Sequence, residues 1–303
     1  MSTSPAGSQH ANAQRLGTLL VVGAAICWSL GGLIARQINL DPWTIVAWRG
    51  TIAAISLLLF LLLRDRGNTW ALFRNMGLGG IGVAICFAAA SISFVIALQH
   101  ATVALILVVQ STAPLIAGLI AWVWMGERLG WARIAAMAVA FAGILLMVGK
   151  AEGHADAIGL TLSGVIAVSF AFATVLTRRF AHVRMTPATC LGTAFMGLAG
   201  FLMAGLDALQ INLVDFGYLF LFGAVQLAIG LILFTTGARH IPAAQAALLS
   251  LVETVLGAFW VFLFLGENPG IYALYGGALV IGAVAANTLY DQRRVQPQPL
   301  NVA

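Results

Sequence analysis

The chain has 303 residues, of which 61% are apolar and only 8% are charged, and its net charge is +5. Soluble domains are about 45–50% apolar and about 25% charged, so this composition excludes a water-soluble fold. The basic residues occur singly or in twos and threes between apolar runs. This pattern is typical of loops that orient membrane spans, and it excludes a nucleic-acid-binding surface.

Apolar runs long enough to cross a bilayer follow one another almost from end to end. The first half predicts spans at 16–38, 43–63, 76–98, 102–125 and 131–149. The second half predicts spans at 158–177, 188–206, 216–237, 242–265 and 271–290. We therefore expect an all-α polytopic membrane protein of ten transmembrane helices, with tails at 1–15 and 291–303 and an external linker at 150–157.

The arginines predict the orientation, because cytoplasmic loops collect Lys and Arg. With the amino terminus in the cytoplasm, the cytoplasmic segments hold twelve basic residues and the external segments hold only Arg36 and Lys150. Both termini are therefore expected to be cytoplasmic. The three cysteines lie inside apolar runs, where their spacing suits neither a zinc site nor a disulfide framework.

The two halves resemble each other at an offset of 140 residues. Matching positions include His100 and His240, the dipeptides Gly126-Glu127 and Gly266-Glu267, and the pairs of small residues Ala138/Ala142 and Ala278/Gly282. The small pairs predict close packing of the fifth and tenth spans. Five spans per repeat place the second repeat (158–290) in the membrane upside down relative to the first (16–149), with a binding site expected where the two meet.

Several of these features together are typical of one family: five plus five spans, Arg49 in the second span, Pro114 in the fourth, and the two Gly-Glu dipeptides. The chain resembles the EamA-type members of the drug/metabolite transporter (DMT) superfamily over 16–290. It is most similar to bacterial exporters of amino acids and other metabolites, including aromatic amino acids. The resemblance implies a multi-pass protein of the bacterial inner membrane. One departure is that Glu253 precedes Thr254, where the family usually has Glu-Pro. This argues against a mechanism that needs a proline kink in both repeats.

Two ionisable residues lie inside predicted spans. A charge near mid-membrane costs about 2.5–3.5 kcal/mol on insertion scales, so it usually marks function. Glu253 is interpreted as a cavity carboxylate that binds a substrate ammonium group or a proton; the alternative is a protonated or hydrogen-bonded packing residue. Arg49 could hold a substrate carboxylate or pair with Glu253, and the alternative is a side chain that snorkels to the outer interface.

Uncharged residues of the spans complete the candidate substrate site, either as ligands or as residues that bridge and pack helices. These candidates are Trp28, Ser91, Gln110, Ser111, Gln226, Gln245 and Ser250. A second set, at helix ends or kinks, has predicted gating or structural roles: Pro114, Glu127, Glu267, His100 and His240. For the two histidines a helix-terminal role is favoured over proton relay.

Sequence motifs for catalysis are missing: the chain has no phosphate-binding loop ending in Ser or Thr, no H-E-x-x-H and no G-x-S-x-G. We therefore expect no enzymatic activity, no cofactor and no metal. The favoured function is secondary transport, with export of a neutral or aromatic amino acid by alternating access, and the proton is a candidate coupling ion. A channel or facilitator for small solutes and a non-transporting scaffold or sensor remain alternatives. The sequence leaves open whether the protein is a monomer or a dimer.

Overall fold

The computed structural model describes residues 5–101, 103–127, 130–148, 156–265 and 270–294. The first half contains α1 (Pro5–Ser29), α2 (Gly31–Ala35), α3 (Pro42–Asp65), η1 (Arg66–Asn68), α4 (Thr69–Asn75), α5 (Gly77–His100), α6 (Val103–Gln110), α7 (Ala113–Met125) and α8 (Trp131–Val148). The second half contains α9 (Ala157–Arg179), α10 (Thr186–Ala204), η2 (Gly205–Leu209), α11 (Leu213–Phe220), the π-helix η3 (Leu221–Ile229), α12 (Gly230–Ala238), α13 (Ala243–Ser250), α14 (Val252–Leu265) and α15 (Gly270–Arg294).

The helices of the described residues include ten apolar stretches. Seven helices of the described residues are long and apolar enough to span a membrane, and three more stretches, 131–146, 243–257 and 274–290, are shorter and apolar. The prediction of an all-helical polytopic membrane protein is confirmed. Side-chain caps start several helices: Asp41 accepts from the backbone N–H groups of Trp43 and Thr44 at 2.9 and 3.2 Å at the start of α3.

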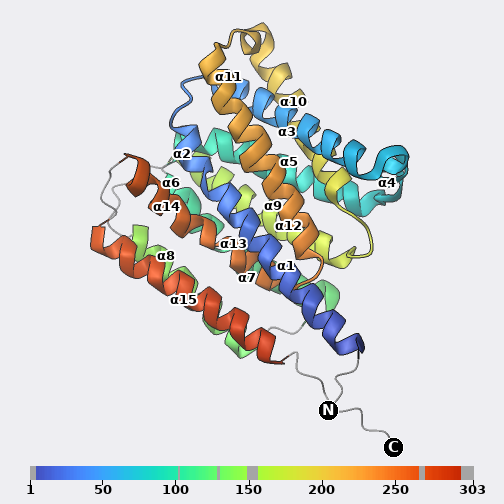
Figure 1. Ribbon diagram of the computed structural model, residues 1–303. Coiled ribbons are helices and arrows are strands. Elements are labelled where there is room, and N and C mark those ends of the chain that lie inside the picture. The colour runs from blue at the N-terminus through green and yellow to red at the C-terminus, as the bar shows by residue number, and fades with distance from the viewer. Residues whose placement is uncertain (1–4, 102, 128–129, 149–155, 266–269, 295–303) are drawn as a thin grey trace, which may run out of the picture.

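The main packing contacts join the two halves in a symmetrical way. α3 packs along α10, α8 along α15, α5 along α9 and α1 along α12. At the offset of 140 residues α1 corresponds to α9 and α5 to the span that ends with α12, so the last two contacts are equivalent. This arrangement is the one expected of two inverted repeats. In Figure 1 α8 and α15 lie side by side at one edge, and the first residues of α1 and the last of α15 lie toward the same end of the molecule.

Glycines let α3 and α10 approach each other closely. A Cβ atom added at Gly50 would lie 2.8 Å from Cα of Gly197, and one added at Gly197 would lie 2.9 Å from the backbone nitrogen of Thr51. Real Cβ atoms do not approach backbone this closely, so both positions require glycine. The two long spans therefore make backbone-to-backbone contact, which fixes α3 and its residue Arg49 against the second repeat.

The predicted packing motif of α8 and α15 is wrong in its residues. The two helices do pack together, but Ala138, Ala142, Ala278 and Gly282 are exposed on the outer surface. The contact uses Gly143, where an added Cβ would lie 2.7 Å from the Gly276 carbonyl oxygen. The predicted close packing of the two helices is therefore present, but it uses other faces than those that carry the predicted small pairs.

Candidate functional site

Four interruptions of helical structure meet at the centre of the protein. α1 ends at Ser29, α6 ends at Gln110, α13 ends at Ser250, and the span that holds α11 and α12 contains the π-helix η3. Of these four interruptions, the sequence indicated only the one in the fourth span, through Pro114. Interrupted helices at membrane depth are typical of substrate sites in transporters, because their unpaired backbone groups line a cavity. π-helical segments also occur frequently at functional sites.

The ninth span is broken without a proline. At the break the Leu251 N–H bonds to the Leu248 carbonyl at 3.1 Å, and the Thr254 N–H bonds to the Leu251 carbonyl at 3.1 Å. In the fourth span the equivalent break lies at residues 111–112, just before Pro114, which occupies the first turn of α7. The two repeats therefore share an interruption although only one has the proline.

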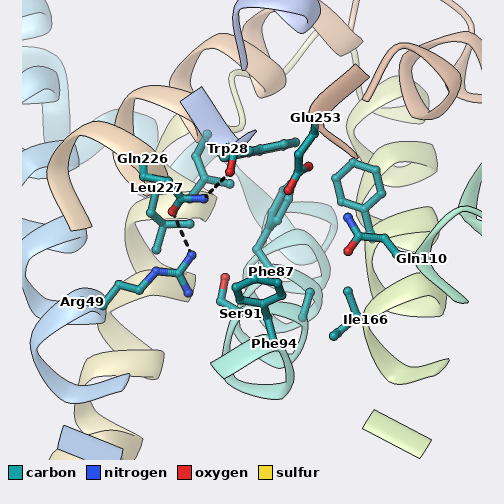
Figure 2. Close-up of a pocket in the computed structure, with 13 residues that line it drawn as sticks. Trp28, Arg49, Phe87, Ser91, Phe94, Gln110, Ile166, Gln226, Leu227 and Glu253 are labelled. Carbon is teal, nitrogen blue, oxygen red and sulfur yellow. Dashed lines mark hydrogen bonds between the residues drawn. The ribbon is translucent and has the colours of Figure 1, made fainter. Parts of the chain in front are cut away.

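A cavity of about 80 Å³ lies between these interruptions (Figure 2). Six of the predicted substrate-site residues line it, each from a different span: Trp28, Arg49, Ser91, Gln110, Gln226 and Glu253. The helices that supply them belong to both repeats. The volume is well below the roughly 300–1,000 Å³ of sites for drug-sized ligands. In this conformation the cavity therefore suits a small molecule.

Arg49 is buried, with 3% of its surface exposed. Its Nη2 donates to Oε1 of Gln226 at 3.0 Å, and the guanidinium carbon lies 4.1 Å from the ring centroid of Phe222. Within the described part of the chain, Nε and Nη1 have no hydrogen-bond partner. Snorkelling to the interface, one of the two interpretations of Arg49, is thus wrong. The arginine instead brings unpaired donors and a positive charge to the cavity.

Glu253 lies in the first turn of α14, and Figure 2 shows its carboxylate and the guanidinium of Arg49 reaching the cavity from different sides. No ion pair joins Glu253 to Arg49 among the described residues. At the repeat offset Arg49 corresponds to Thr189 and Glu253 to Ala113, both buried and uncharged. One repeat therefore supplies the basic side chain of the cavity and the other supplies the acidic one.

Aromatic rings form one wall of the cavity. Trp28 packs against Phe170 and Phe234 with ring centroids 5.8 and 5.2 Å apart, and Phe87 packs edge-on against both phenylalanines at 6.5 and 6.1 Å. Trp28, Phe87 and Phe170 line the cavity. Trp28 thus combines the two roles proposed for it, because it packs in a cluster and also forms a cavity wall.

Three predicted substrate ligands lie away from the cavity. The hydroxyl of Ser111 donates to the Val108 carbonyl at 2.6 Å, and that of Ser250 donates to the Ala246 carbonyl at 3.0 Å. Both hydroxyl groups therefore bond to their own helices. Gln245 is 1% exposed and does not line the cavity. The structure does not bring these side chains to the site, because each helix face is set by packing that the sequence does not show.

Three of the predicted gating residues, Glu127, His100 and His240, lie at or just beyond the ends of helices. Arg178 joins three spans, because its Nε donates to Oε1 of Glu127 at 3.2 Å and its Nη1 donates to the Arg239 carbonyl at 2.8 Å. Neighbouring His240 has a pKa below its ordinary value, because of burial and of the positive charges of Arg239 and Arg178. Glu267 lies outside the described residues.

At the other end of the bundle His100 contacts Asp156, with 2.8 Å between Nδ1 and Oδ2. Asp156 also caps α9 by accepting from the Gly159 N–H at 2.8 Å. The hydrogen bond from the Gly159 N–H, followed in size by the one from the His100 imidazole, holds the pKa of the Asp156 carboxyl below its ordinary value. This contact joins the two repeats, since α5 belongs to the first and α9 to the second.

Comparison with known proteins supports the same architecture. The family model of the EamA-like transporter family matches the chain twice, over residues 15–149 and 157–289. The chain belongs to the EamA-like transporter family. As an EamA-like protein it is a membrane transporter rather than an enzyme, and its two matches are the two copies of a duplicated domain.

Among the described residues, no group of three or more His, Cys, Asp or Glu side chains is placed to hold a metal ion.

Two further similarities are consistent with this family. The chain is 24% identical over 181 residues to a protein of Bacillus subtilis (strain 168) named "Uncharacterized transporter YvbV", and the match covers 56% of this chain and 58% of that protein. A solved structure titled "Crystal structure of protein" is similar with a TM-score of 0.78 and 22% identity, covering 93% of this chain and 99% of the other. The second similarity shows the fold.

Apart from Trp28, the aromatic residues of the cavity in this EamA-like transporter were not predicted from the sequence; they are Phe87, Phe94 and Phe170. One signal was present, since Phe94 and Phe234 occupy equivalent positions in the two repeats. A phenylalanine in an apolar helix, however, has no feature that distinguishes a cavity wall from packing or from a lipid contact.

Proposed function

We propose that this transporter is a secondary carrier that exports a small zwitterionic metabolite, a neutral or aromatic amino acid, across the bacterial inner membrane, with both termini in the cytoplasm. The observation that carries this proposal is the pair of opposite charges in one cavity. Arg49, with unpaired Nε and Nη1, and Glu253 line the same space without forming an ion pair.

Opposite charges held apart match the two ends of an amino acid. A carboxylate at Arg49 would satisfy donors that are otherwise buried and unpaired, which removes a desolvation penalty of about 1–3 kcal/mol or more. An ammonium group at Glu253 would offset the burial of that carboxylate in the same way. The rings of Trp28, Phe87 and Phe170 would contact the apolar part of the substrate. The cavity volume of about 80 Å³ favours the smaller members of this substrate class.

Alternating access would follow from the arrangement of the repeats. The cavity lies between them, and contacts at both ends of the bundle cross from one repeat to the other: Arg178 with Glu127 at one end, and His100 with Asp156 at the other. Opening one set of contacts while the other holds would expose the cavity to one side at a time. Glu253 is the group that would exchange a proton for the substrate's ammonium group.

The test is uptake of radiolabelled amino acids into proteoliposomes, with and without a pH gradient, for the wild type and for Glu253→Gln. We expect saturable uptake that competing amino acids inhibit, and loss of the pH response in the variant. A flux that rises linearly with concentration would indicate a channel instead. No uptake of any amino acid in the panel would contradict the proposed substrate class.

A further inference from the structure

Gln226 makes two hydrogen bonds that join three spans. Its Oε1 accepts from Nη2 of Arg49 in α3 at 3.0 Å, and its Nε2 donates to the Trp28 carbonyl in α1 at 3.2 Å. The side chain is buried, with 4% of its surface exposed, and Figure 2 shows it between Arg49 and Trp28. Both ends of the amide are therefore in use within the protein, which leaves little of it for a substrate.

The local backbone is built around this amide. α1 stops at Ser29, so carbonyls of its last turn lack helical partners, and one of them accepts from Gln226. Gly31 begins α2 one residue later, after Leu30, and a Cβ atom there would lie 3.0 Å from Nε2 of Gln226. The break between α1 and α2 therefore provides both the acceptor and the space for this side chain.

The π-helix η3 supplies two groups that hold the guanidinium of Arg49. Phe222 and Gln226 lie four residues apart in η3, so the ring stacks on the guanidinium while the amide accepts from Nη2. The contacts fix one face and one nitrogen, whereas Nε and Nη1 have no partner in the described structure. The arginine is thus held in place with part of its donor capacity left for another group.

We propose that Gln226 is a positioning residue that holds Arg49 as the receptor for the substrate's carboxylate and connects this receptor to the break in α1. The inference rests on the proposed function, in which Arg49 binds a carboxylate. A neutral amide is essential to this role. It fixes the guanidinium through an oxygen acceptor without neutralising its charge, whereas a carboxylate at the same position would pair with Arg49 and compete with the substrate.

The connection to α1 gives carboxylate binding a mechanical consequence. A substrate that draws the guanidinium toward the cavity pulls on Gln226, which is bonded to the end of α1 at Trp28. Trp28 itself lines the cavity. Occupation of Arg49 is thereby transmitted to the helix break that separates α1 from α2, which is a position where a small rotation reorients two segments of one span.

The experiment measures proteoliposome uptake of a neutral amino acid and of its decarboxylated amine by Gln226→Glu and Gln226→Met. In Gln226→Glu the ratio of the KM for the amino acid to the KM for the amine should rise by about tenfold or more, because a charged partner now occupies Arg49. Gln226→Met keeps the side-chain volume and removes both hydrogen bonds, so it should raise the KM for the amino acid and leave that for the amine unchanged. Thr235→Val is the control, because within the described structure the buried Thr235 hydroxyl bonds to the Leu231 carbonyl of its own helix and Thr235 does not line the cavity.

The outcomes separate this inference from the proposed function. An unchanged KM for the amino acid in both Gln226 variants, or an equal change for amino acid and amine, would show that Gln226 is only structural and overturn the inference. Wild-type protein that shows no saturable amino acid uptake would contradict the proposed function itself. Gln226→Glu is nearly isosteric with the wild type, so the test does not depend on the larger change to methionine.

Discussion

Arg49→Met tests whether this buried arginine serves the substrate or the fold. Burying a charge in a membrane span costs about 2.5–3.5 kcal/mol on insertion scales. In return Arg49 gains one hydrogen bond to Gln226, worth about 0.6 kcal/mol between membrane helices, and a desolvated contact with the Phe222 ring, worth about 2 kcal/mol. These contributions nearly cancel, so the substitution should change the free energy of unfolding by about 1 kcal/mol or less.

The assay is thermal unfolding in detergent, followed with a thiol-reactive dye. Cys27, Cys86 and Cys190 suit this readout, because all three are half-buried or buried and become reactive on unfolding. The melting temperature of Arg49→Met should lie within about 4 °C of the wild type, while the KM for amino acid uptake should rise about tenfold or more and the stabilisation by added substrate should fall. Arg64→Met is the matched control, because Arg64 belongs to the same helix, is exposed and lies outside the cavity.

A fall in stability of about 3 kcal/mol or more on removing Arg49 would refute this reasoning, since that is the range for breaking a buried structural ion pair. An unchanged KM for amino acid uptake in Arg49→Met would refute the assignment of Arg49 to the substrate carboxylate.

Three further predictions concern the framework around the site. Gly197→Val should greatly reduce the yield of folded protein, because its Cβ would meet the α3 backbone at Thr51, whereas Gly164→Val, with nothing within 4 Å, should express normally; equal yields in size-exclusion chromatography would contradict this. Glu127→Gln should weaken the contact with Arg178 and so raise the leak of substrate through the carrier, measured as uptake without a gradient. An unchanged leak would argue against a gate at this contact. The lowered pKa of Asp156 stabilises the folded state at pH values above the ordinary carboxyl pKa, and this stabilisation is lost as the pH falls through the pKa of the folded state. Asp156→Asn should therefore show a smaller drop in melting temperature between neutral and acidic pH than the wild type. An equal drop in both proteins would contradict the role of the cap.

Most of the fold could be predicted from the sequence, because the requirement to satisfy backbone hydrogen bonds in lipid leaves only helices for runs such as those of α5 and α9. The helix breaks could not be predicted as securely. Pro114 marks the break in the fourth span, but the equivalent break at Leu251 has neither proline nor glycine. Hydropathy measures transfer into lipid and is insensitive to the few backbone hydrogen bonds that change at such a break.

The ionisable residues of the candidate site could be predicted from the sequence, whereas the contacts that its side chains make could not. Arg49 and Glu253 were identified because a charge in a membrane span is costly wherever it points. The partner of Arg49 is Gln226, 177 residues away in the sequence, and no local pattern reveals that contact. Ser111 and Ser250 have polar hydroxyl groups like that of Ser91, but they bond to their own helices, and only the packed structure distinguishes these cases.

The central claim is that Arg49 and Glu253 bind the two ends of one substrate. It is tested most directly by competition of modified amino acids with a transported amino acid in proteoliposomes of the wild type, Arg49→Met and Glu253→Gln. Esterifying the carboxylate should weaken inhibition of the wild type and have no further effect in Arg49→Met, while removing the amine should weaken inhibition of the wild type and have no further effect in Glu253→Gln. If each modification weakens inhibition equally in all three proteins, the two charges act elsewhere and the claim is wrong.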